Sequence, residues 1–288
     1  NSPVLNFLKK WKWLIFSFFV FIASLLLYKL LSNESFLIGP SRPEEMVGRA
    51  QYMLSQPNVI IFYYLNKLLF PVNLNIDPDI EVVTGLLSWA FAVPIFIIAF
   101  LLVCSLIVFK NRFIFFFLCW FFIILSPSSS IVTLHDLAAE HRVYLASGGI
   151  FILLAYGISL VTHQWVKFPR LKFSPILILC VLVGVLGVMT MKRNAVWKTE
   201  LLLWQDTYDK STHKLRPLIN LARAHSLEGN TVKAIQYYQD SLIQGPEVFA
   251  TNYNLGDLYL KKQLVKDAIK HFQLASRIEP EIPETFAK

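Results

Sequence analysis

The fold is decided by two consecutive stretches of 34 residues, LRPLINLARAHSLEGNTVKAIQYYQDSLIQGPEV at 215–248 and FATNYNLGDLYLKKQLVKDAIKHFQLASRIEPEI at 249–282. Both stretches carry leucine, a small residue, alanine, an aromatic residue and proline at the same offsets. The matched positions are Leu221/Leu255, Ala222/Gly256, Ala234/Ala268, Tyr238/Phe272 and Pro246/Pro280. Small residues let two helices approach, larger side chains fill the space between them, and proline ends the second helix. We therefore expect each stretch to fold as an antiparallel helix pair.

A period of 34 residues is typical of tetratricopeptide (TPR) repeats, which stack helix pairs into a solenoid. Residues 215–248 and 249–282 form two complete units, and residues 281–284 are expected to begin a third. Such arrays usually need three units for independent stability, so two units must be stabilised by packing against another element. We expect that element to be a capping helix at 197–208, inside a linker that covers 193–214.

The rest of the chain has the composition of a membrane protein. Hydrophobic residues make up 55% of the 288 residues, 24 residues are phenylalanine, and the charged residues crowd into the last third. A helix needs about 20 apolar residues to cross the hydrocarbon core of a bilayer. Five runs approach or exceed this length: residues 13–28, 82–109, 113–134, 143–166 and 173–191. We predict an all-α protein with a polytopic transmembrane helix bundle over 1–192, followed by a TPR α-solenoid over 215–288.

One further apolar segment, residues 58–71, has a different character. Tyr63, Asn66 and Lys67 fall on one helical face, and the opposite face is apolar, formed by Ile60, Ile61, Tyr64, Leu65, Leu68 and Leu69. This amphipathic pattern favours a helix that lies in the membrane interface, although the apolar run 58–74 is also roughly long enough to span.

The orientation in the membrane follows from the basic loops, because Lys and Arg in short loops favour the cytoplasmic side. Residues 9–12, 110–112 and 167–172 are basic and contain no acidic residue. With these loops inside and five crossings, the TPR units emerge on the outer, periplasmic or lumenal side. Short loops and a compact array favour a bacterial inner membrane; the eukaryotic counterpart is the endoplasmic reticulum membrane.

The best candidate for chemistry is a polar cluster in the second outer loop, directly before a predicted span. Its members are His135, Asp136, Glu140, His141, Arg142 and Tyr144. Charged groups at a bilayer boundary are costly unless hydrated or paired, so such a cluster is a candidate site. The guanidinium of Arg142 suits a phosphate at headgroup depth, because its planar fork matches phosphate oxygens. The same residues also suit a helix cap with a solvated ion pair, and their spacing does not decide between the two.

Other chemistry-bearing residues favour structural roles. Asp77 and Asp79 resemble a carboxylate pair for metal binding or acid–base work, but the intervening proline favours a solvated turn. Cys104, Cys119 and Cys180 lie in apolar runs without the paired spacing of metal sites or disulfides.

Several function classes lack support in the sequence. Many of the basic residues behind the net charge of +8 flank apolar runs, where they set topology, so the charge does not indicate nucleic-acid binding. The sequence contains no Walker loop, no His-Glu-x-x-His, no Gly-x-Ser-x-Gly and no dinucleotide fingerprint. No residue pattern identifies a cofactor, and catalysis of the soluble-enzyme type has no support.

Three motifs, in their order and spacing, resemble the family of transmembrane-and-TPR-containing glycosyltransferases. They are LFPVNLNID at 69–77, EHRVYL at 140–145, and the segment from Arg193 to Trp204 that leads into the TPR units. This family is similar to the C-type superfamily that uses polyprenyl-phosphate sugars, and it includes O-mannosyltransferases. The resemblance covers nearly the whole chain but only the second half of such a protein, so we expect a fragment. Relatives often have Leu-Pro-Ser where this chain has Leu145-Ala146-Ser147.

The resemblance implies an inverting transfer of a sugar from a polyprenyl-phosphate carrier to an acceptor on the outer face. Arg142 and His141 would then contact the lipid phosphate and stabilise its developing charge, Glu140 would orient them, and Tyr144 would anchor or donate at the interface. The TPR groove would hold a protein acceptor or partner. The catalytic carboxylate, and any divalent metal, would belong to the missing N-terminal half. A membrane-anchored TPR scaffold without catalysis is an alternative, and a transporter or polymerase for lipid-linked glycans is another.

Overall fold

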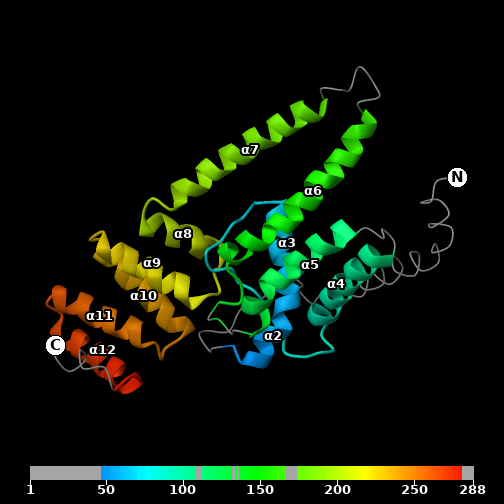
Figure 1. Cartoon of the computed structure of the whole chain (residues 1–288). Helices are drawn as coiled ribbons and strands as arrows, with labels where there is room; N and C mark the ends of the chain where they lie inside the picture. Colours follow the sequence, from blue (N-terminus) through cyan, green and yellow to red (C-terminus); the bar gives the residue numbers. More distant parts are fainter. Residues whose placement is uncertain (1–46, 108–111, 132–133, 135, 166–173, 281–288) are drawn as a thin grey trace, which may run out of the picture. The chain divides into compact units, whose positions relative to one another are not determined.

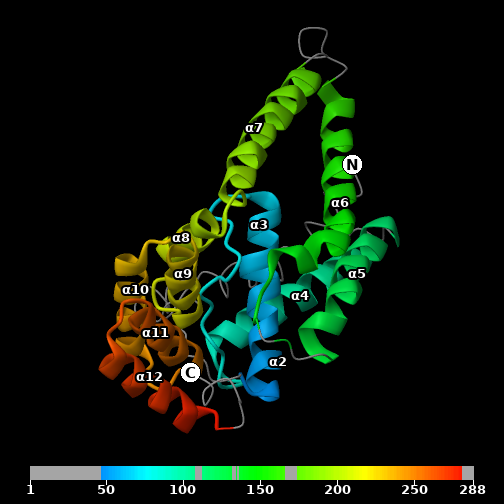
Figure 2. The same cartoon turned by 90° about the vertical axis from the view of Figure 1, so that its left-hand side faces the viewer.

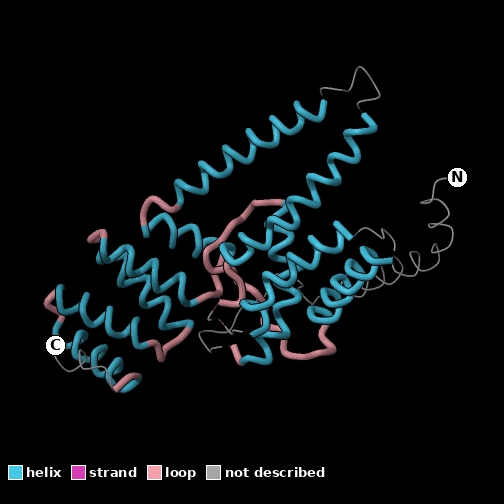
Figure 3. The backbone as a smooth tube through the Cα atoms, in the orientation of Figure 1, coloured by secondary structure: helices cyan, strands magenta, loops and turns pink. Residues whose placement is uncertain are grey.

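The computed structural model describes residues 47–107, 112–131, 134, 136–165 and 174–280 (Figure 1). Within these ranges the chain consists of helices joined by loops and turns, without a β-strand (Figure 3). The predicted all-α class is confirmed. The chain divides into two compact units, which we describe separately. The first contains Val47–Val72 and Ile80–Lys172, and the second contains Asn73–Asp79 and Phe173–Lys288.

Four helices in the described part of the chain are long and apolar enough to cross a membrane. They are α4 (Trp89–Ile107), α5 (Arg112–Ser126) with the turn after it, α6 (Tyr144–Trp165) with the turn before it, and α7 (Ser174–Val196). These helices correspond to the last four predicted runs, and the first run, 13–28, lies outside the described residues. Their length and composition indicate an integral membrane protein.

The segment predicted as interfacial forms one continuous helical stretch that begins earlier than expected. It comprises α2 (Arg49–Asn58), the π-helical turn η1 (Val59–Tyr64) and α3 (Leu65–Leu69). Pro71 follows shortly after the helix end, where its lack of a backbone N–H prevents the helix from continuing. Ile60, Ile61 and Tyr64 of the predicted apolar face are buried, whereas Leu69 is exposed. This face therefore contributes to the protein core.

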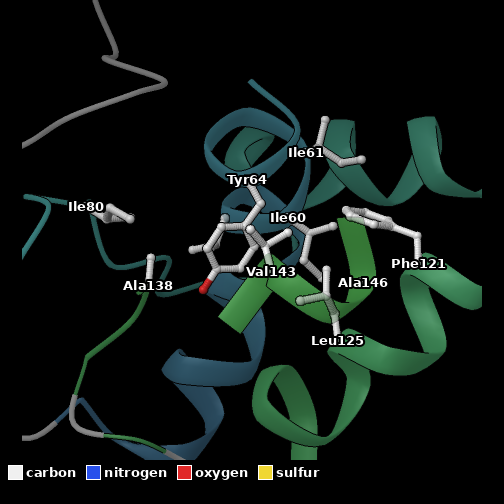
Figure 4. Packing of buried hydrophobic residues seen from close by; sticks show 10 residues of the cluster. Ile60, Ile61, Tyr64, Ile80, Phe121, Leu125, Ala138, Val143 and Ala146 are labelled. Atoms are coloured by element: carbon white, nitrogen blue, oxygen red, sulfur yellow. The ribbon is translucent and has the colours of Figure 1, made fainter. Parts of the chain in front are cut away.

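The core of the first unit gathers side chains from η1, α5 and the start of α6 (Figure 4). Tyr64 lies close to Ile60 and to Val143, the last residue of the 3₁₀ turn η3 (Glu140–Val143) that precedes α6. A second π-helical turn, η2 (Pro127–Ile131), extends α5 (Arg112–Ser126). Gly149 of α6 marks a close helix contact, because a Cβ there would lie 2.6 Å from the carbonyl oxygen of Phe117 in α5.

The second unit contains the two helix pairs at their expected residues (Figure 2). In the first pair α9 (Leu215–Leu227) is followed by α10 (Thr231–Gln244), and in the second α11 (Phe249–Lys261) is followed by α12 (Val265–Ile278). Equivalent turn residues, Gly229 and Gln263, both have positive φ, at 80° and 60°. A Cβ on Gly256 would lie 2.7 Å from the ring of Phe272, which explains why a small residue is needed there. The 34-residue period therefore applies to the backbone conformation of the turns as well as to the side-chain pattern.

The expected capping helix is present as α8 (Glu200–Lys210). Thr199 caps the start of this helix, and its Oγ1 accepts a hydrogen bond from the backbone N–H of Leu202 at 3.2 Å. In the 34-residue period, α8 corresponds to α10 and α12, the second helices of the two complete units. Each of these three helices has a fully buried residue at the same position of the period. The residues at that position are Thr207, Ser241 and Ala275. The boundary predicted at residue 192 stays a prediction; α7 belongs to the same compact unit as the repeats.

Acidification is expected to destabilise the repeats through two histidines. His225 is buried and stacks on Tyr237, and His271 stacks on Tyr259. Burial, with a neighbouring lysine in each case, lowers the pKa of both side chains below the ordinary 6.5. The unfolded chain therefore binds protons that the folded chain does not, and stability falls as the pH drops below about 6.5.

The measurement is thermal unfolding of the protein between pH 7.5 and 5.5, with the double variant His225→Gln/His271→Gln beside it. We expect the melting temperature of the wild type to fall across this window and the variant to depend less on pH. Equal pH dependence of the two proteins would contradict the prediction.

Candidate functional site

The predicted outer-loop cluster lies in the first unit, where hydrogen bonds from α2 and η1 hold the backbone that leads into α6. Gln56 Nε2 donates to the carbonyl of Leu137 at 3.0 Å, and the hydroxyl of Tyr64 accepts from the N–H of Ala139 at 3.1 Å. Both side chains are almost fully buried. Buried polar groups of a loop need such partners, so these contacts determine the path of the loop.

Arg142 points into the same region and is held by two acceptors. Its Nη1 donates to the carbonyl oxygen of Asp136 at 2.8 Å and lies 3.5 Å from the hydroxyl of Tyr52. That hydroxyl in turn donates to the carbonyl of Ser128 at 2.6 Å. The side chain of Arg142 also interacts with the hydroxyl of Tyr64. These contacts hold the planar guanidinium in a defined orientation at the start of an apolar helix.

The other predicted site residues fall into two groups. Glu140 is half-buried and accepts a hydrogen bond from the hydroxyl of Tyr63 at 3.2 Å. His141 is exposed, and Tyr144 has 84% of its surface exposed. Glu140 and Arg142 therefore approach the tyrosines of α2 and η1, whereas His141 and Tyr144 lie on the exposed side of the turn. His135 lies outside the described residues.

Both tyrosine side chains keep their hydroxyl proton in this setting: Tyr52 donates to the Ser128 carbonyl, and Tyr64 accepts from the Ala139 N–H. Burial raises the pKa of Tyr52 and Tyr64 above the ordinary 10, while the nearby charge of Arg142 acts in the opposite direction. The sequence did not indicate that these tyrosines take part in the site. They precede their loop partners by 75 to 90 residues, and no local pattern connects them.

The second candidate, the Asp77 and Asp79 pair, lies in the second unit and is not a solvated turn. Asp77 is 1% exposed and Asp79 is 4% exposed. Lys214 and Arg216 form ion pairs with Asp77, and His213 Nδ1 lies 3.5 Å from Asp79 Oδ2. The expectation of solvation was wrong because the compensating cations come from a turn more than 130 residues later. Among the described residues, no group of three or more His, Cys, Asp or Glu side chains could hold a metal ion.

Comparison with known proteins adds one relationship. No protein-family model matches the chain. A stretch of 146 residues is 24% identical to the human protein O-mannosyl-transferase TMTC3, and a stretch of 144 residues is 24% identical to its mouse counterpart. Each stretch makes up 50% of this chain and 15% of the relative, so the chain spans only a small part of either protein. At this level of identity, the matches support a distant relationship of the chain to TMTC-like glycosyltransferases.

Proposed function

We propose that this chain is the C-terminal part of a membrane glycosyltransferase that transfers a sugar from a polyprenyl-phosphate carrier to a protein acceptor. The distant similarity to protein O-mannosyl-transferases supports the reaction class. The observation that carries the proposal is the placement of Arg142, held by the Asp136 carbonyl and by Tyr52 at the start of a membrane-capable helix. In this proposal the repeats are TPR units that bind the acceptor, on the periplasmic or lumenal side.

Arg142 provides positive charge where the leaving group of the reaction would develop negative charge. The contacts to Asp136 and Tyr52 both use Nη1, so a phosphate would be bound by the edge of the guanidinium that faces away from these two acceptors. Because the arginine is already oriented by protein acceptors, little reorganisation accompanies the reaction, and such preorganised charge stabilises a transition state strongly. His141 would reach the same phosphate from the exposed side of the turn, and Tyr144 would anchor the turn in the headgroup layer.

Arg142→Ala is expected to reduce sugar transfer about 100-fold, the usual effect of removing one preorganised charge-stabilising donor. The measurement is transfer from a panel of radiolabelled polyprenyl-phosphate sugars by the full-length protein in membranes. Arg142→Lys should retain part of the activity, because lysine supplies charge without the bidentate fork.

Arg223→Ala is the matched control, since Arg223 forms only a half-exposed ion pair with Glu200 and should be dispensable for transfer. Thermal unfolding and membrane insertion of each variant show that the fold is retained. Full activity of a folded Arg142→Ala variant would refute the phosphate role. If the wild type transfers from no donor yet captures a protein through its repeats, the chain is a membrane-anchored scaffold.

A further inference from the structure

In the second unit an irregular segment, residues 73–79, packs against the turn that joins α8 to α9. The segment bends on itself: Asn73 has a φ of 51°, and the N–H of Asp77 donates to Asn75 Oδ1 at 3.3 Å. Two hydrogen bonds bind the main chain of this segment. Lys210 Nζ donates to the carbonyl of Leu74 at 2.8 Å, and Ser211 Oγ donates to the carbonyl of Asp77 at 2.8 Å. A third hydrogen bond involves a side chain of the segment: Asn75 Nδ2 donates to Ser211 Oγ at 2.7 Å. The segment thus lies in the second unit much as a bound peptide would.

Charge complementarity accompanies these contacts. Asp77 pairs with Lys214 and lies 3.6 Å from Nε of Arg216, and Asp79 faces His213. The carboxylates are buried, whereas Lys214, Arg216 and His213 keep 22% to 64% of their side-chain surface exposed. The turn 210–216 therefore has the features of a receptor for acidic peptides: cations at its rim and polar groups that bind main-chain carbonyls.

We propose that the turn 210–216 is a binding site for an acidic, turn-forming segment of the pattern Asn-x-Asp-x-Asp, and that residues 75–79 fill it in the resting protein. A partner or acceptor that carries this pattern would compete with the internal segment. Because the internal segment is attached to the same chain, its effective concentration is in the millimolar range, so binding from solution requires its displacement. The proposal extends the partner-binding role proposed for the repeats, but its test needs no sugar transfer, so the two can fail separately.

The test uses the double variant Asp77→Ala/Asp79→Ala of the full chain in detergent micelles. The probe is a fluorescein-labelled peptide with the sequence of residues 74–80, LNIDPDI. Fluorescence anisotropy is expected to show binding to the variant at least tenfold tighter than to the wild type. A peptide with both aspartates changed to asparagine, and the triple variant that adds Lys214→Glu, should both lose this gain.

A second measurement, on the wild type alone, tests the proposal even if the double variant does not fold. Millimolar peptide should raise hydrogen exchange at the amides of residues 75–79 by displacing the internal segment, and the asparagine peptide should not. The proposal is overturned if a folded double variant binds no better than the wild type. If that variant does not fold, unchanged exchange in the wild type overturns it.

Discussion

Replacing Lys214 with methionine is expected to lower the free energy of unfolding of the repeats by about 3 kcal/mol, because it removes the main partner of a buried carboxylate. Asp77 is 1% exposed, so water cannot replace the lost ammonium group. Arg216 remains at 3.6 Å and offsets part of the loss. The measurement is native-state hydrogen exchange at the slowest amides of α9 and α10 in the full chain.

Lys261→Met is the matched control for this prediction. Lys261 pairs with Asp257 at 2.8 Å, but 65% of the lysine side chain is exposed. Exposed pairs of this kind contribute less than about 1 kcal/mol, so the control should differ little from the wild type. Adding Asp77→Asn to Lys214→Met should restore part of the stability, since it removes the buried charge. Equal effects of the two lysine variants would contradict a buried ion pair at Asp77.

Gly149→Ala and Gly148→Ala are expected to change stability in opposite directions, although the two residues are neighbours in α6. A Cβ at Gly149 would lie 2.6 Å from the carbonyl oxygen of Phe117 and 3.1 Å from the ring of Trp120. The carbonyl belongs to the backbone of α5, so the two helices must separate, at a cost of about 1–3 kcal/mol. At Gly148 a Cβ meets nothing within 4 Å, and alanine should stabilise the helix by up to about 1 kcal/mol.

Thermal unfolding of both glycine variants in detergent micelles distinguishes these outcomes. The melting temperature should fall for Gly149→Ala and stay the same or rise for Gly148→Ala. Two equal shifts would show that the close approach of α5 and α6 is not rigid.

The repeats could be predicted in detail because their pattern is local. One 34-residue period located α9 through α12, the small residue at Gly256 and the aromatic residue at Phe272. The membrane-capable helices could be predicted equally well, since the length of an apolar run alone identifies them. The helix before Pro71 was found only in part: its first half contains Gln51, Tyr52 and Gln56, polar residues that do not continue the apolar face.

The polar contacts could not be predicted, because their partners lie far apart in sequence. Arg142 and Tyr52 are 90 residues apart, and Asp77 and Lys214 are 137 residues apart. Hydropathy and turn preferences describe neighbours only, so Asp77 looked like a solvated turn residue, and nothing in the local sequence pointed to Tyr52. Whether His141 and Tyr144 act with Arg142 stays a prediction, since both are exposed on the other side of the turn.

The buried ion pair at Asp77 also has a consequence for biogenesis. The ribosome makes Asp77 well before Lys214, which follows it by 137 positions in the sequence. At about 5–20 residues per second, roughly 7 to 27 seconds pass between the synthesis of Asp77 and that of Lys214. During that interval the segment 73–79 stays hydrated, because its carboxylates cannot be buried alone. The segment 73–79 can therefore pack into the second unit only after translation has passed Arg216. Until then the nascent segment is accessible to chaperones and proteases.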